Sequence, residues 1–260
     1  MWRSGSVIAL TIGVASNQAP AAIFDRDDRQ YVSTAPGSPY SPIGIVSRGS
    51  LGEYRTTGVL VDECDVLTSQ HVLGYGKSPL GKRLKFIGAR GTPERVSSMG
   101  TVIAVGGLER IHSPAEQFEV RGRDWLLLRL DKCLGVSLGY AVLKTGPFST
   151  GEFRNLQSAG YPGGRSSHTG LTLDPSCRFT GSKGGVWLND CASMPGNSGG
   201  PIFRISGSRS KPQMEVYAIQ SAGYAWAAPV PFAAGYDNQA TPVDSIARQI
   251  APYLRASGDH

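Results

Sequence analysis

The sequence predicts an all-β protein made of two antiparallel β-barrels. Three observations support this fold class: the 260 residues include 34 glycines, only 18% are charged, and short β-type runs recur between clusters of Gly, Pro and Ser. Runs bounded by turn residues in this way favour a barrel or sandwich over helices. A chain of this length buries a large core, either as one unit or as two closely apposed halves.

The predicted strands divide evenly about a linker at residues 131–150. The six strands before it are Ile43 to Ser47, Tyr54 to Val61, Asp65 to Thr68, Leu84 to Ile87, Thr101 to Val105 and Trp125 to Leu130. The six after it are Leu156 to Tyr161, Leu171 to Phe179, Val186 to Leu188, Ile202 to Arg204, Glu215 to Ser221 and Ala228 to Phe232. We therefore expect an N-terminal segment and first six-stranded barrel over residues 22–130 and a second over residues 151–241.

The final segment, residues 242–260, predicts a helix and a tail. Apolar residues recur there at helical spacing, at Val243, Ile246, Ile250 and Tyr253. Asp244 or Ser245 is suited to cap the start of this helix. We expect the helix to pack on the second barrel and to carry no chemistry.

The first residues have the pattern of a secretory signal. Arg3 precedes the apolar run Val7 to Ala15, and the small residues Ala19-Pro20-Ala21 follow it. The run is about half as long as a membrane span requires. We expect a signal peptide within residues 1–21, cleaved after Ala15 or Ala21, and a secreted or periplasmic protein. The alternative is a dispensable N-terminal strand.

A glycine-rich turn around Ser198, from Pro195 to Pro201, is the most informative segment for function. Glycines on both sides allow backbone angles that let a serine hydroxyl project while nearby N–H groups converge on one point. That arrangement suits a nucleophile beside an oxyanion hole. A Gly/Ser/Asn segment is also an ordinary turn, so the serine needs partners.

A serine nucleophile requires an imidazole base, and the imidazole requires a carboxylate. Among four histidines, His71 alone ends a buried strand pattern, whereas His112 and His168 lie in polar stretches and His260 is terminal. Asp124 opens the apolar strand that follows. Either residue taken alone is more often structural, but together with Ser198 they form a candidate triad.

An esterase of the α/β-hydrolase type is a competing interpretation, because the serine turn also satisfies Gly-x-Ser-x-Gly. In that fold the acid and the histidine follow the serine in the chain. Here His260 is the only histidine after Ser198. A terminal histidine is a poor base, which disfavours an esterase.

The three motifs, in the order His, Asp, Ser, resemble those of the chymotrypsin-fold serine endopeptidases. Thr68 to His71 resembles the family's Thr-Ala-Ala-His, Asp124 to Leu128 its Asp-Ile-Ala-Leu-Leu, and Gly196 to Pro201 its Gly-Asp-Ser-Gly-Gly-Pro. The resemblance covers roughly residues 38–255. Finer features resemble the bacterial glutamyl-endopeptidase branch: Asp27 to Arg29, Ala159 to Gly163, Asn189 to Cys191 and Met194-Pro195.

This resemblance implies a serine endopeptidase that needs no cofactor. His71 would be the base, Asp124 its orienting acid and Ser198 the nucleophile, while the N–H groups of Gly196 and Ser198 would form the oxyanion hole. The substrates would be proteins or peptides, and we expect a monomer. The alternative is a catalytically silent protein of the same fold that binds without cleaving.

The resemblance also implies a specificity pocket that carries no full charge. Its members would be Ala192, Ser193, Gln220, Ser221 and Gly223. The lack of an acid near Ala192 argues against Lys or Arg substrates. Glutamyl-specific relatives generally have histidine at the Gln220 position, so an acidic preference and a small or neutral preference both stay open.

The four cysteines fit an oxidising compartment because they are even in number. Cys177 and Cys191 flank the strand before the serine turn, and we expect them to pair. Cys64 and Cys133 would meet if their strands pair antiparallel as in the family. A metal site is not expected, because the chain has no Cys-x-x-Cys or paired-His motif.

The net charge of +6 favours anionic partners only weakly, because the basic residues are scattered. The densest basic run is Lys82-Arg83 with Lys85, and its one aromatic neighbour, Phe86, falls in a predicted strand. We therefore expect no nucleic-acid binding. We also expect no membrane insertion, because the N-terminal apolar run is too short for a span and no other segment could cross a bilayer.

Overall fold

The structure is a computed structural model that describes most of the chain. The described residues are 22–49, 55–74, 78–107, 116–146, 148, 153–163, 170–208, 210–223, 231–232 and 237–254. The predicted signal peptide and the histidines at 112, 168 and 260 lie outside them. Within the described ranges, no helix is both long and apolar enough to span a bilayer.

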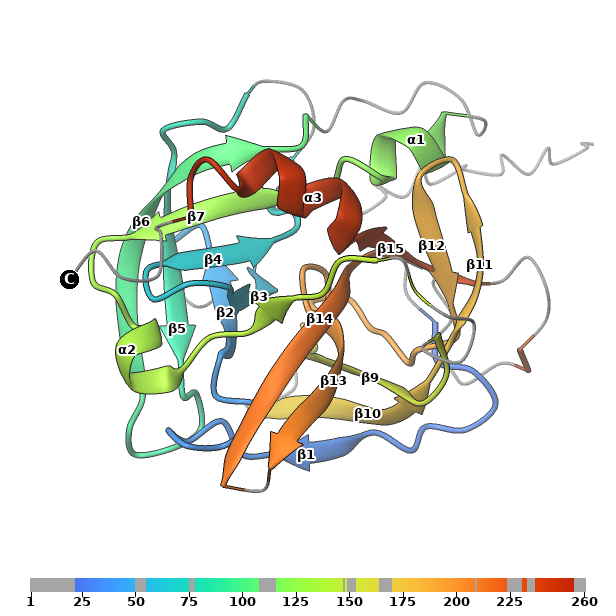
Figure 1. Cartoon of the computed structure of the whole chain (residues 1–260), viewed down its shortest axis with the longest axis horizontal. Helices are drawn as coiled ribbons and strands as arrows, with labels where there is room; N and C mark the ends of the chain where they lie inside the picture. The colour runs from blue at the N-terminus through green and yellow to red at the C-terminus, as the bar shows by residue number, and fades with distance from the viewer. Residues whose placement is uncertain are drawn as a thin grey trace, which may run out of the picture.

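The first half is a closed barrel of six antiparallel strands, as predicted (Figure 1). Its strands are β2 (Ile43–Ser47), β3 (Arg55–Leu60), β4 (Asp65–Thr68), β5 (Arg83–Gly88), β6 (Val96–Val105) and β7 (Leu126–Leu130). The ring runs β2-β3-β4-β7-β6-β5 and closes where β5 pairs with β2. Nearly every residue of β2, β3, β4 and β7 is buried, so the barrel is filled by side chains.

The second half is a nine-stranded sheet, whose path runs β1-β10-β9-β13-β14-β15-β12-β11 with β8 paired to β14. Its strands are β1 (Gln30–Val32), β8 (Val142–Leu143), β9 (Leu156–Gly160), β10 (Leu171–Cys177), β11 (Phe179–Lys183), β12 (Val186–Asn189), β13 (Pro201–Ser208), β14 (Lys211–Ala222) and β15 (Asn238–Pro242). Five of its strands correspond to predicted ones. β1 and β8 join from the N-terminal segment and the linker, and β11 and β15 were not predicted, so the sheet exceeds the six strands expected. The all-β class and the two-part architecture are confirmed.

Three strand assignments in the second half were wrong. The predicted strand Leu171 to Phe179 ends at Cys177, and Phe179 begins the separate strand β11. The sequence Asn-Gln-Ala-Thr-Pro of β15 was not expected to be a strand, yet all five residues are buried between β14 and β12. The predicted strand Ala228 to Phe232 lies partly outside the described residues, and its described part, Pro231 and Phe232, is not in a strand. Pro231 lacks an N–H for strand pairing.

The helices are short. They are the 3₁₀ helix η1 (Gln70–Leu73), α1 (Gln117–Arg121), α2 (Gly135–Leu138) and α3 (Val243–Ile250). The predicted C-terminal helix is α3, which lies against β14 and β15 (Figure 1). Its expected side-chain cap was wrong: the N-cap is Pro242, and the Asp244 carboxylate instead accepts the N–H of Gly146.

One hydrophobic cluster joins the two halves. It contains residues of the first barrel such as Ile45 and Leu127, residues of the sheet such as Phe203 and Ile219, and Ile246 of α3. Burying apolar surface shared by both halves fixes their relative position. The ends of β4, β7, β13 and β14 consequently meet at one interface.

Candidate active site

His71 lies in η1, directly after β4. Every residue of β4 is buried, and η1 ends at Gly74, whose φ of +82° suits glycine. The His71 side chain is 12% exposed. A buried strand therefore holds this imidazole at the edge of the first barrel.

Asp124 binds His71 at two points. Its Oδ1 accepts the backbone N–H of His71 at 2.9 Å, and its Oδ2 lies 2.6 Å from the ring Nδ1. The hydroxyl of Ser221 donates to the same Oδ2 at 2.6 Å. Because an ionised carboxylate only accepts, Nδ1 must carry a proton, which leaves Nε2 of a neutral ring as an acceptor.

The Asp124 carboxyl is fully buried. Burial alone raises the pKa of a carboxyl, but the charge interaction with His71 and the hydrogen bonds from His71 and Ser221 outweigh it. The pKa of Asp124 accordingly lies below its ordinary value. The side chain stays ionised and holds the imidazole orientation.

The Ser198 turn is clamped between the two halves. The Ser198 carbonyl accepts the N–H of Thr57 at 2.9 Å and the hydroxyl of Thr56, both on β3. On the other side, the N–H of Gly199 donates to the Gln220 carbonyl of β14 at 2.7 Å. The serine backbone is thus fixed by contacts from both halves of the molecule.

Gly199 brings the serine turn next to the histidine segment. Its φ is +76°, and a Cβ there would collide with the Thr57 carbonyl, the Thr68 hydroxyl and the Ser69 N–H. Thr68 and Ser69 directly precede η1. The fold therefore places His71, Asp124 and the Ser198 turn at one interface. Between these described residues, no hydrogen bond joins the Ser198 hydroxyl to the His71 ring, a bond that often forms only when substrate binds.

Two backbone N–H groups of the serine turn, those of Gly196 and Ser198, have no acceptor among the described residues. The N–H groups of Asn197, Gly199 and Gly200 are all bound to backbone carbonyls. No acceptor within the described residues takes those of Gly196 and Ser198. Two unused donors beside a serine are what an oxyanion hole requires.

Comparison with known proteins decides the family. The model of the trypsin-like peptidase domain matches residues 56–209, more than half of the chain and the part that contains His71, Asp124 and Ser198. The chain belongs to the trypsin-like peptidases. A search of curated proteins gave no match.

A solved structure shares the fold of this peptidase. The structure of a Glu endopeptidase in complex with MPD aligns over 89% of this chain and 98% of its own, with a TM-score of 0.58 and 16% identity. At that identity the likeness establishes a common fold. That common fold is the one expected from the sequence motifs.

The residues expected to line the peptidase's pocket come from two segments that lie side by side. Ala192 donates its N–H to Asp174 Oδ2 at 2.6 Å, and Ser193 donates its N–H to the Ala22 carbonyl at 2.9 Å. Gln220, on β14, donates its side-chain Nε2 to Asn189 Oδ1 of the same segment at 3.2 Å. The hydroxyl of Ser221, on the same strand, supports Asp124. Gly223 directly follows β14.

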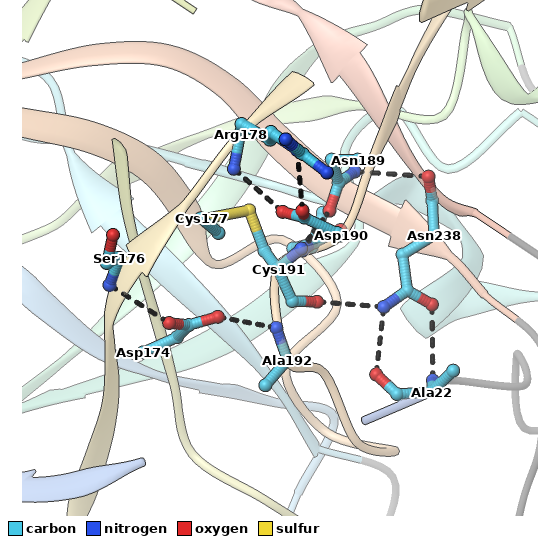
Figure 2. Close-up of a disulfide and its surroundings, with 11 residues drawn as sticks. Ala22, Asp174, Ser176, Cys177, Arg178, Asn189, Asp190, Cys191, Ala192 and Asn238 are labelled. Carbon is cyan, nitrogen blue, oxygen red and sulfur yellow. Dashed lines mark hydrogen bonds and ion pairs between the residues drawn. A yellow bond between two sulfur atoms is a disulfide. The ribbon is translucent and has the colours of Figure 1, made fainter. Parts of the chain in front are cut away.

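Both expected disulfides are present. Cys64–Cys133 links the start of β4 to the chain just past β7, where the Leu130 N–H also binds the Cys64 carbonyl at 2.8 Å. Cys177–Cys191 links the end of β10 to the segment that contains Ala192 (Figure 2). The second bridge therefore braces residues 189–193, the expected pocket segment.

Several supporting residues were missed in the sequence. Asp174 holds the pocket segment, and its carboxyl is almost fully buried. Burial raises its pKa to about 6, against the lowering effect of hydrogen bonds from Ala192 and Ser176. Asn189 and Asn238 form the buried amide network drawn in Figure 2. Asn189 stood in the family-like segment Asn189 to Cys191 without an assigned role, whereas the only sequence signal of Asn238 was polarity within apolar surroundings.

The described residues contain no group of three or more His, Cys, Asp or Glu side chains placed to hold a metal ion.

Proposed function

We propose that the chain is a secreted serine endopeptidase that hydrolyses peptide bonds through His71, Asp124 and Ser198. The observation that carries this proposal is the buried Asp124 carboxylate bound to both the backbone N–H and the ring of His71. A structural histidine does not require an ionised carboxylate dedicated to its tautomer, whereas a general base does.

The first half of the reaction makes an acyl-enzyme. Nε2 of His71 takes the Ser198 proton as the hydroxyl oxygen attacks the peptide carbonyl carbon, and the carbonyl electron pair moves to oxygen. The N–H groups of Gly196 and Ser198 stabilise that oxyanion. His71 then gives the proton to the leaving amine, and the C–N bond breaks.

Water completes the cycle. His71 takes a proton from a water molecule that attacks the acyl carbon, and it returns the proton to Ser198 as the ester bond breaks. Throughout, Asp124 stabilises the imidazolium without accepting its proton. Removal of one oxyanion donor in such a site typically costs about 10²- to 10³-fold in rate.

Secretion is part of the proposal. The apolar run Val7 to Ala15 supports a cleaved signal, and two disulfides suit an oxidising compartment. We propose the mature enzyme as a monomer in which residues 22–130 and 151–241 form the two catalytic halves. Its substrates are proteins or peptides. The matching solved structure is named as a Glu endopeptidase, so glutamate is one candidate for the residue before the cleaved bond.

A fluorophosphonate probe tests the proposal directly. We expect the purified protein to be labelled on Ser198 and to cleave a denatured protein substrate. Ser198→Ala should abolish both, and Asp124→Asn should lower kcat by about 10³- to 10⁴-fold, because the tautomer of His71 is no longer fixed. A folded protein whose Ser198 is not labelled would instead support the alternative, a catalytically silent protein that binds without cleaving.

A further inference from the structure

Thr57 of β3 joins the serine turn to the segment that follows β9. Its hydroxyl donates to the Gly196 carbonyl at 2.8 Å and accepts the Tyr161 N–H at 2.9 Å. A backbone carbonyl can only accept and a backbone N–H can only donate, so the direction of both hydrogen bonds is fixed. Thr57 is fully buried, and its hydroxyl therefore makes these bonds without competition from solvent.

The segment held in this way, residues 161–163, contacts the serine turn at a second point. The N–H of Gly163 donates to the Pro195 carbonyl at 2.5 Å. Gly196 has a φ of +101°, and a Cβ on it would lie 2.3 Å from the Gly163 nitrogen and 2.5 Å from the Tyr161 carbonyl oxygen. The segment therefore packs directly against the backbone of the serine turn.

The hydrogen bond to the Pro195 carbonyl sets the direction of the Gly196 N–H. Both groups belong to one planar trans peptide, in which the C=O and the N–H point to opposite sides. Because Gly163 holds the carbonyl on one side, the Gly196 N–H is directed to the other side, where it has no acceptor among the described residues. A rotation of this peptide would break the bond to Gly163 and turn the N–H away from the oxyanion.

We propose that Thr57 is a positioning residue for the oxyanion hole. Its hydroxyl holds residues 161–163 against the serine turn, these residues hold the Pro195 carbonyl, and the Gly196 N–H is thereby oriented before substrate binds. The donor is needed most when negative charge develops on the substrate carbonyl oxygen, so the Thr57 hydroxyl assists the chemical step and not substrate binding. This inference rests on the peptidase function proposed above.

Thr57→Val tests the inference, because valine has the shape of threonine without the hydroxyl. The bond from the residue 57 N–H to the Ser198 carbonyl, and the bond from the Thr68 hydroxyl to the residue 57 carbonyl, involve only its backbone and are kept. On a peptide that the wild type cleaves, we expect kcat to fall about 100-fold, the loss typical of one oxyanion donor, and KM to change less than about twofold. Thr57→Ser restores the hydroxyl and should restore kcat.

A trifluoromethyl ketone analogue of the same peptide gives a second measurement. The Ser198 oxygen bonds to the ketone carbon, His71 takes the serine proton, and the carbonyl electron pair moves to the ketone oxygen. Because this oxygen occupies the oxyanion hole, Ki should rise in Thr57→Val by about the factor by which kcat falls. The pH dependence of kcat/KM should stay as in the wild type, because the bonds from His71 to Asp124 do not involve Thr57.

Thr241→Val is the matched control. The Thr241 hydroxyl also lies in a buried residue and donates to a backbone carbonyl, that of Arg121 at 2.9 Å, but not to the serine turn. This variant should keep the kcat and Ki of the wild type. Equal losses of kcat in Thr57→Val and Thr241→Val, a loss in KM alone, or an unchanged Ki would overturn the inference.

Amide hydrogen exchange in the wild type gives a test that needs no variant, should Thr57→Val fail to fold. The N–H groups of Tyr161 and Gly163 should both be protected, because each has a fixed acceptor. Unprotected N–H groups at these two residues would mean that the segment does not hold the serine turn.

Probe labelling separates this inference from the proposed function. A wild type that is labelled on Ser198 and cleaves peptides, together with an equally active Thr57→Val variant, refutes the Thr57 assignment alone. A wild type that is neither labelled nor active refutes both.

Discussion

Two buried aspartates show how the surroundings of a single residue set its role. Asp124 faces a histidine and a hydroxyl, and its pKa is lowered even though burial alone would raise it. Asp174 faces two neutral backbone N–H groups with other carboxylates nearby, and its pKa is raised to about 6. The first is held ionised beside the candidate base, whereas the second gains a proton in mildly acidic solution.

Asp174 makes the free energy of unfolding depend on pH. Its pKa rises from an ordinary 3.8 to about 6 on folding, so the stability it contributes is complete below pH 3.8 and is lost as pH rises through 6. Two pKa units correspond to about 3 kcal/mol. Urea unfolding from pH 4 to 7 should show this decline in the wild type and not in Asp174→Asn. Asp244→Asn is the control and should keep the decline; parallel curves for all three proteins would refute the assignment.

At the scale of elements, the serine turn depends on the lack of a side chain at Gly199. Gly199→Ala would force a Cβ into Thr57, Thr68 and Ser69. We expect a loss of at least about 3 kcal/mol in unfolding free energy, together with loss of probe labelling. Gly81→Ala is the matched control, because Gly81 also has positive φ but nothing lies within 4 Å of its Cβ position.

Gly81→Ala should cost only about 1 kcal/mol and leave labelling intact, because it carries the backbone penalty without the collision. Equal losses in both variants would mean that backbone strain, and not contact with the first barrel, makes glycine necessary at residue 199.

The elements that could be predicted from the sequence were those with local signals. The apolar runs of β2 and β4 predicted the first and last residues of both strands correctly. The helical spacing of Val243, Ile246 and Ile250 predicted α3. β15 could not be predicted, since its polar residues are buried by pairing with β14 and β12 and not by their own hydrophobicity.

The candidate site follows the same division. His71, Asp124 and Ser198 stand in local motifs, so they could be proposed from the sequence. The hydrogen bond from the Ser221 hydroxyl to Asp124 joins residues 97 positions apart. The hydrogen bond from the Gln220 amide to Asn189 joins residues 31 positions apart. No local pattern specifies such pairings, because tertiary contacts create them.

At the scale of the whole molecule, the two disulfides should differ in effect. Cys64–Cys133 spans 69 residues and Cys177–Cys191 spans 14. In the chain-entropy model their loss costs about 4 and about 3 kcal/mol. We expect the double Cys→Ser variant of the first pair to lower the melting temperature more, and that of the second to lower kcat/KM more, because it braces the pocket segment.

Thermal unfolding and peptide hydrolysis, measured on both double variants, check this contrast. A second-pair variant with normal kcat/KM and a first-pair variant with poor kcat/KM would reverse the assignment.

All four cysteines are used in these bridges, and neither bridge crosses from one half of the molecule to the other. The two halves are therefore held together without a disulfide, by the shared hydrophobic cluster and by the hydrogen bonds from Thr56 and Thr57 to the serine turn. A substitution that weakens this interface would separate the serine turn from His71 and Asp124 while each half keeps its own disulfide.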